Sequence, residues 1–96
     1  MVSNYDVVEV SGKQKYILDF WAEWCGPCKM TSKYIDEFID EHPEFDIYKV
    51  NVDELPEVAE QYSVISLPSI LFIDNGEIVD RHIGLMTKKQ LEEKLL

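Results

Sequence analysis

The segment that most constrains the fold is residues 16–21, Tyr-Ile-Leu-Asp-Phe-Trp, a nearly continuous apolar run broken by one acid. Such a run is typical of a central strand covered on both faces, because a strand with one face in water alternates apolar and polar residues. Residues 27–41 follow with apolar side chains at helical spacing, and Pro43 then predicts the end of that helix. A buried strand that leads directly into a long helix indicates an α/β chain.

The remaining segments continue this alternation. We predict strands over 5–10, 47–52, 69–73 and 77–82, and helices over about 56–62 and 87–96, the last capped by Thr87. Asn75-Gly76 predicts a tight antiparallel hairpin between the last two strands. Residues 11–15 leave room for no more than a turn between the first two strands. The expected order is β, β, α, β, α, β, β, α, in one domain over residues 1–96 with a mixed sheet and helices on both faces.

Composition excludes several classes of protein. With 46% hydrophobic and 29% charged residues, the chain reads as soluble and globular. A formal charge of -10, from 19 acidic and 9 basic residues, argues against binding to a nucleic acid backbone. No stretch approaches the ~20 apolar residues of a membrane span, and residues 1–6 lack the features of a secretory signal. We therefore expect a cytoplasmic monomer with no nucleic acid or membrane partner.

The two cysteines carry the chemistry. Cys25 and Cys28 lie where the buried strand meets the long helix, and a helix N-terminus stabilises a thiolate, the nucleophile of disulfide exchange. Two intervening residues let the second sulfur reach the first and close a ring. An inert buried pair is one alternative. Zinc is another, but it needs four ligands, and His42 and His82 are distant in sequence; a zinc ion shared between two chains would meet that need.

Residues 19–29, Asp-Phe-Trp-Ala-Glu-Trp-Cys-Gly-Pro-Cys-Lys, closely resemble the active-site segment of the thioredoxin family. The resemblance continues through 49–53, 66–69, Asn75-Gly76 and 82–84, in order and at family-like spacing, so it covers nearly the whole chain. It implies a thioredoxin fold: a mixed central sheet flanked by helices. Family members usually place a full helix between the first two strands, which would be shortened or absent in this chain.

The resemblance also implies roles for four residues. Cys25 matches the attacking cysteine, Cys28 the resolving one, Asp19 the buried acid beneath them and Lys49 the lysine near that acid. Independently, an acid inside an apolar strand should have a raised pKa and could accept a proton from Cys28. The plainer alternatives are a solvent-facing acid at a strand end and an ordinary lysine at the sheet surface.

Six further residues would bind substrate if the resemblance holds. Pro68 matches the family's cis-proline, and the backbone at Leu67 would pair with the substrate chain. The docking surface implied around Cys25 consists of Trp24, Gly26, Pro27, Leu67, Pro68 and Gly84. The alternative for Trp24 is packing in the core, although Trp21 is the better core candidate of the two.

These features favour a protein-disulfide reductant that acts on disulfide-containing protein substrates, needs no cofactor or metal and is recycled by a separate thioredoxin reductase. The Gly26-Pro27 pair is the one that reducing members of the family carry. An oxidase or isomerase is the second interpretation, since Lys33 replaces a proline that usually kinks the helix. A binding subunit with incidental redox chemistry is the third.

Overall fold

A five-stranded mixed sheet forms the centre of the protein, and a computed structural model describes all of its residues, 1–96. The strand order is β1-β3-β2-β4-β5, in which β2 is parallel to β3 and antiparallel to β4. The elements are β1 (Val2–Asn4), α1 (Val7–Ser11), β2 (Lys15–Trp21), α2 (Gly26–Glu41), β3 (Ile47–Asn51), α3 (Pro56–Gln61), β4 (Ser69–Asp74), β5 (Glu77–Ile83) and α4 (Lys88–Leu95).

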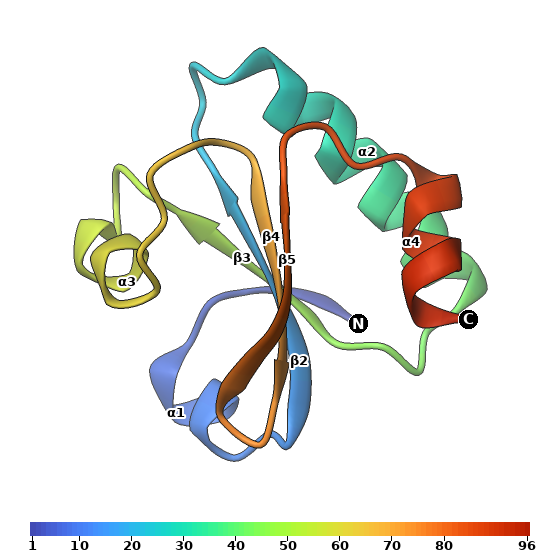
Figure 1. Cartoon of the computed structure of the whole chain (residues 1–96), viewed down its shortest axis with the longest axis horizontal. Coiled ribbons are helices and arrows are strands. Elements are labelled where there is room, and N and C mark those ends of the chain that lie inside the picture. The colour runs from blue at the N-terminus through green and yellow to red at the C-terminus, as the bar shows by residue number, and fades with distance from the viewer.

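Helices cover both faces of this sheet, as Figure 1 shows: α2 and α4 lie on one side, and α1 and α3 on the other. Each side has its own hydrophobic core, because successive side chains of a strand point to opposite faces. On β2, Leu18 and Phe20 belong to the core beneath α1 and α3, whereas Ile17 packs with residues of α2 and α4. The predicted central strand, covered on both faces, is confirmed.

The start of the chain differs from the prediction. Residues 5–10 are not a strand: the first strand is Val2–Asn4, and residues 7–11 form the one-turn helix α1. The reason is Asp6, whose carboxylate accepts hydrogen bonds from the backbone N–H groups of Val8 at 2.9 Å and Glu9 at 3.3 Å. This is an N-cap, which favours helix over strand for the residues that follow. The order is therefore β, α, β, α, β, α, β, β, α, with a first helix that is present but short.

The other boundaries agree closely with the sequence pattern. Helix α2 ends at Glu41, with His42 as its C-cap just before Pro43. The hairpin between β4 and β5 turns at Asn75 and Gly76, both with positive φ (52° and 78°). Thr87 caps α4 in a reciprocal arrangement with Gln90. None of the helices combines the length and the apolar character needed to cross a bilayer.

Candidate active site

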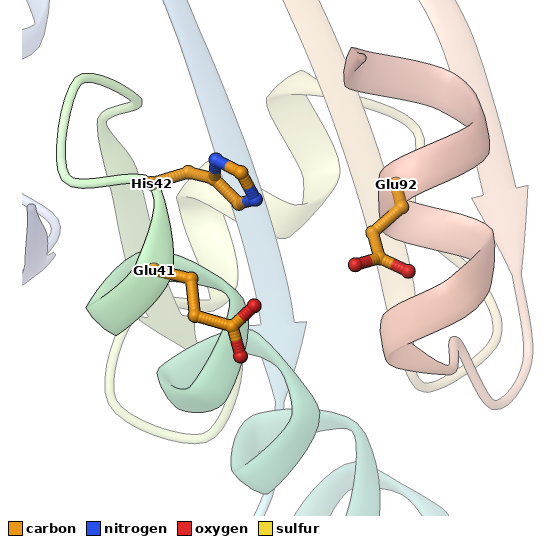
Figure 2. A group of neighbouring side chains, drawn as sticks. All are labelled: Glu41, His42 and Glu92. Carbon is orange, nitrogen blue, oxygen red and sulfur yellow. The ribbon is translucent and has the colours of Figure 1, made fainter.

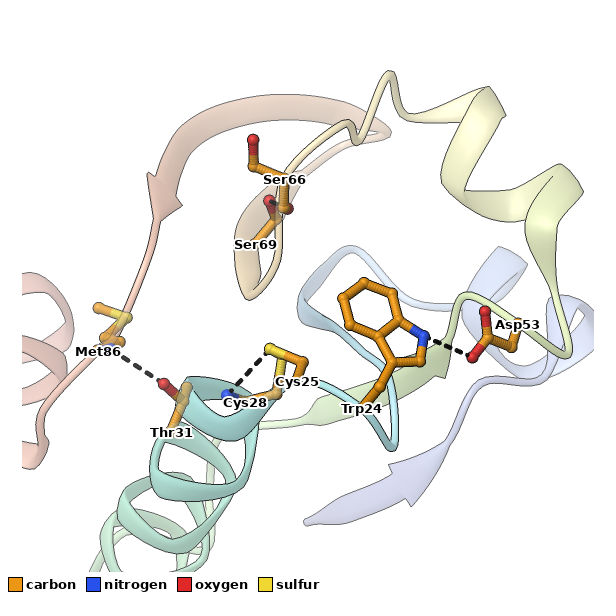
Figure 3. Close-up of a disulfide and its surroundings, with 8 residues drawn as sticks. All are labelled: Trp24, Cys25, Cys28, Thr31, Asp53, Ser66, Ser69 and Met86. Atoms are coloured by element: carbon orange, nitrogen blue, oxygen red, sulfur yellow. Dashed lines mark hydrogen bonds between the residues drawn. A yellow bond between two sulfur atoms is a disulfide. The ribbon is translucent and has the colours of Figure 1, made fainter.

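The two cysteines lie at the start of α2, at the end of the sheet where β2 finishes. Cys25 is the N-cap of the helix, and the backbone N–H of Cys28 donates a hydrogen bond to Cys25 Sγ at 3.2 Å. The two sulfurs form a disulfide, with Cα atoms 5.3 Å apart (Figure 3). In the reduced form, the same N–H group and the positive end of the helix dipole would stabilise a thiolate on Cys25.

Exposure distinguishes the two sulfur-bearing residues. Cys25 is 5% exposed and Cys28 only 1%, and both pack against Ala22, Trp21 and Leu67. Both residues are therefore buried, and Cys25 is the slightly more exposed of the two. The structure places both residues of the predicted pair in one site.

Asp19 lies on β2, two residues before the strand ends at Trp21, and is completely buried. Neither carboxyl oxygen has a hydrogen-bond partner. Burial raises the pKa of Asp19 to about 7; the positive charge of Lys49 lowers it, and the negative charge of Asp36 raises it. The predicted burial of this acid is confirmed, and a carboxyl group with a pKa near neutrality can both accept and release a proton at physiological pH.

Lys49 is the residue opposite Asp19 in the register of β2 and β3. Its amine does not bond to the acid but reaches α2, where Nζ contacts Ser32 Oγ and lies 3.5 Å from Asp36 Oδ1. The lysine therefore lies near Asp19, as the resemblance implied. The two α2 partners were not predicted. Their i, i+4 spacing shows that they share a helix face, but only the packed structure shows that this face meets Lys49.

The loop before β4 closes the site from the other side. The Leu67–Pro68 peptide is cis, as the resemblance implied; Pro68 is buried and Leu67 is half-buried. Gly84, with φ of 97°, donates its backbone N–H to the carbonyl of Pro68 at 2.9 Å. The fold thus brings Leu67, Pro68 and Gly84 together, although 15 or more residues separate Gly84 from the other two in the chain.

Trp24 points away from the core. Its side chain is 70% exposed, and its indole Nε1 donates a hydrogen bond to Asp53 Oδ2 at 3.0 Å (Figure 3). Gly26 and Pro27 are exposed beside it. Core packing is thereby excluded for Trp24, whereas Trp21 is partly buried against the cysteines, as predicted. The role of Asp53 as the partner of this indole was not predicted.

One further contact joins the site to the last part of the chain. Thr31, fully buried on α2 one turn beyond Cys28, accepts a hydrogen bond from the backbone N–H of Met86 at 3.1 Å (Figure 3). Nothing in the local sequence pattern singles out this threonine, because its partner lies 55 residues away.

The two histidines have neighbours other than the cysteines. His42 caps the opposite end of this 16-residue helix, where Glu41, His42 and Glu92 gather in one group (Figure 2). Glu41 already forms an ion pair with Lys88. His82 Nε2 is 2.9 Å from the carbonyl oxygen of Leu85. The structure therefore places the group of potential metal ligands far along α2 from the disulfide.

A disulfide at a strand-to-helix junction follows a strand that carries a buried acid, and the loop with the cis-proline packs against it through Leu67. These features define the class of thiol–disulfide oxidoreductases built on a mixed sheet. The family model Thioredoxin matches residues 2–96, so the chain belongs to the thioredoxin family. It is an oxidoreductase that acts through its cysteine pair. The resemblance of the sequence to this family and the fold it implied are confirmed.

Relatives of known identity support the assignment. A thioredoxin from Rickettsia typhi is 49% identical over 95% of this chain and 92% of its own length. A chloroplastic thioredoxin M-type from Pisum sativum is 40% identical over 97% of this chain, which spans only 55% of the pea protein. Among solved structures, oxidised mitochondrial thioredoxin 3 from Saccharomyces cerevisiae superimposes with a TM-score of 0.82 and 27% identity, covering 99% of this chain and 92% of the yeast chain.

Proposed function

We propose that the protein is a general reductant of protein disulfides. The observation that carries the proposal is the hydrogen bond from the Cys28 N–H to Cys25 Sγ at the start of α2, because it favours the thiolate on Cys25, the slightly more exposed residue of the pair. The support from relatives is consistent, since those compared above are all named as thioredoxins.

The reaction runs in two exchange steps. The Cys25 thiolate attacks one sulfur of the substrate disulfide; a bond between Cys25 and that sulfur forms, and the substrate S–S bond breaks to release a thiolate. Cys28 then loses its proton to the Asp19 carboxylate and attacks Cys25 Sγ. The Cys25–Cys28 bond forms, the mixed disulfide breaks, and the substrate leaves as a dithiol once its thiolates take up protons. Two electrons pass from the protein to the substrate.

Asp19 suits the role of proton acceptor because its pKa of about 7 lies near the operating pH. Lys49 would tune this acceptor through its charge, which lowers the pKa of Asp19 from the value that burial alone would give. We assign both residues to the catalytic machinery together with Cys25 and Cys28.

Substrate would dock on the surface around Cys25. Trp24, Gly26 and Pro27 are exposed on one side of the disulfide, while Leu67, Pro68 and Gly84 form the facing side. The backbone of Leu67 would pair with an extended segment of the substrate chain, a mode in which main-chain hydrogen bonds give affinity without requiring one sequence.

Recycling requires an external electron donor, which we propose to be a thioredoxin reductase. We also propose that the protein acts as a monomer in the cytoplasm. The similarity to the pea protein, which is chloroplastic, makes an organelle the competing location.

The test is reduction of insulin by dithiothreitol, followed by the turbidity of the precipitated chains. The oxidised protein at micromolar concentration should accelerate precipitation severalfold or more. Cys25→Ser should abolish the acceleration. A full rate with Cys25→Ser, or no acceleration by the unchanged protein, would contradict the proposal.

A further inference from the structure

The amine of Lys49 is held by α2 rather than by the acid it faces. Lys49 and Asp19 are partners in the register of adjacent strands, yet both oxygens of Asp19 lack any hydrogen-bond donor. Nζ instead contacts Ser32 Oγ and lies 3.5 Å from Asp36 Oδ1. The lysine side chain is 19% exposed, and Lys49 also lines a cavity of about 420 Å³ at the β1 side of the sheet.

We propose that Ser32 and Asp36 are positioning residues that hold the amine of Lys49 on the surface of α2, so that its charge acts on Asp19 across space and not by direct contact. This inference rests on the proposed function, in which Asp19 exchanges a proton with Cys28. A contact ion pair would keep Asp19 ionised and make it a poor base for a thiol, since an adjacent opposite charge favours the charged form.

The charges that act on Asp19 come from two elements. β3 contributes Lys49, α2 contributes Asp36, and β4 presents the apolar Ile70 opposite the acid. Asp36 therefore acts in two ways, because its own negative charge raises the pKa of Asp19 and its carboxylate retains the lysine. Ser32 is uncharged and can act only through Lys49. A substitution of Ser32 by a neutral residue therefore changes the position of the Lys49 amine without removing or adding a charge near Asp19.

The experiment is a titration of the Asp19 side-chain carboxyl by ¹³C NMR in the oxidised protein, where the disulfide leaves no thiol to titrate alongside it. Ser32→Ala should lower the midpoint by about 0.5 pH unit, because the freed amine moves toward the acid in a low-dielectric site. The shift should vanish in the Lys49→Met background. Asp36→Asn should lower the midpoint in both backgrounds, and more when Lys49 is present.

Two matched variants serve as controls. Ser32→Thr keeps a hydroxyl at this position and should keep the midpoint. Asp40→Asn removes an exposed acid one turn further along α2 and should leave the midpoint unchanged. An unchanged or raised midpoint in Ser32→Ala, or an equal shift with and without Lys49, would overturn the inference.

The titration is independent of turnover, so it separates this inference from the proposed function. If insulin reduction fails while the Ser32→Ala shift depends on Lys49, the proposed function is wrong and the positioning stands. If insulin is reduced but the midpoint does not move, the positioning is wrong and the proposed function stands.

Discussion

The hydroxyl of Thr31 accepts a hydrogen bond from the backbone N–H of Met86 inside the protein, and so ties the helix that carries the cysteines to the segment after β5. That segment begins at Gly84, which itself bonds to the carbonyl of Pro68. The two hydrogen bonds together connect α2, through the segment after β5, to the loop that precedes β4. The docking surface is therefore shaped by the same helix that presents the reactive sulfur.

Thr31→Val should loosen this connection. Valine has the shape of threonine but no acceptor, so the buried N–H of Met86 loses its partner, which costs about 1–3 kcal/mol of folding free energy. We expect a severalfold higher KM for insulin and little change in the rate with a small aromatic disulfide, which needs no extended docking surface. Steady-state kinetics with both substrates measure the difference. An equal loss with both would show that the threonine does not act through docking.

Asp6→Ala serves as a control for Thr31→Val, because it should also destabilise the protein but at a place remote from the disulfide. It is also a prediction in itself. The Asp6 carboxylate caps α1, at the end of the sheet away from the disulfide (Figure 1). Its loss should lower the free energy of unfolding by about 1 kcal/mol, the usual cost of removing such a cap. Urea denaturation measures this change. The KM for insulin should stay as it is, and a rise would connect α1 to the site.

Asp19→Asn should stabilise the protein at alkaline pH. Because the pKa of Asp19 is raised to about 7, the folded state binds more protons at this group than the unfolded state between about pH 4 and pH 7, and stability falls as pH rises through that window. Above pH 8 the ionised acid costs up to about 4 kcal/mol, taking 1.36 kcal/mol per pH unit between the two pKa values.

The measurement is urea denaturation of the oxidised protein and of Asp19→Asn at pH 4 and pH 8.5. The variant should be the more stable by several kcal/mol at pH 8.5, and the gain should shrink toward zero near pH 4. A gain of equal size at both pH values would mean that the stabilisation comes from packing or hydrogen bonding of the amide and not from the lost charge.

Asp53→Ala should release the indole of Trp24. The hydrogen bond to Asp53 orients an exposed ring beside Cys25, so its loss should shift the indole N–H resonance of Trp24 and lower insulin reduction severalfold. Asp53→Asn retains an acceptor oxygen and should restore both the resonance and most of the rate. If insulin reduction is equally slow in Asp53→Ala and Asp53→Asn, the negative charge of Asp53 matters and not its orientation of the Trp24 ring.

The parts of the structure that the sequence predicts are those that depend on local pattern. The apolar run of β2, the helical spacing of apolar residues in α2 and the Asn75-Gly76 turn each predict their element from a few neighbouring residues. Residues 5–10 do not follow their local pattern. The valines at 7, 8 and 10 favour a strand, whereas the cap at Asp6 favours a helix, and the helix forms with Val10 as its only buried residue.

The residues of the site also differ in how far the sequence predicts them. Cys25, Cys28, Asp19 and Pro68 stand in a recognisable motif, so the sequence identifies them. Ser32 and Thr31 do not, and Asp53 lies in the resembling segment 49–53 without any sign there of its partner. Each of the three contacts a residue that only the folded structure brings near. Their contacts join elements distant in the chain, and no periodicity in the sequence encodes which atoms will meet.

The arrangement of aromatic residues on the two sides of the sheet has a practical consequence. Both tryptophans lie at the cysteine end of β2, with Trp21 packed against the small cluster that contains the cysteines. Four of the five tyrosines instead lie in or against the core beneath α1 and α3: Tyr5, Tyr16, Tyr48 and Tyr62. Tryptophan emission should therefore follow the oxidation state of the cysteines, and tyrosine signals should follow the opposite core. One sample carries two separate optical probes without any label.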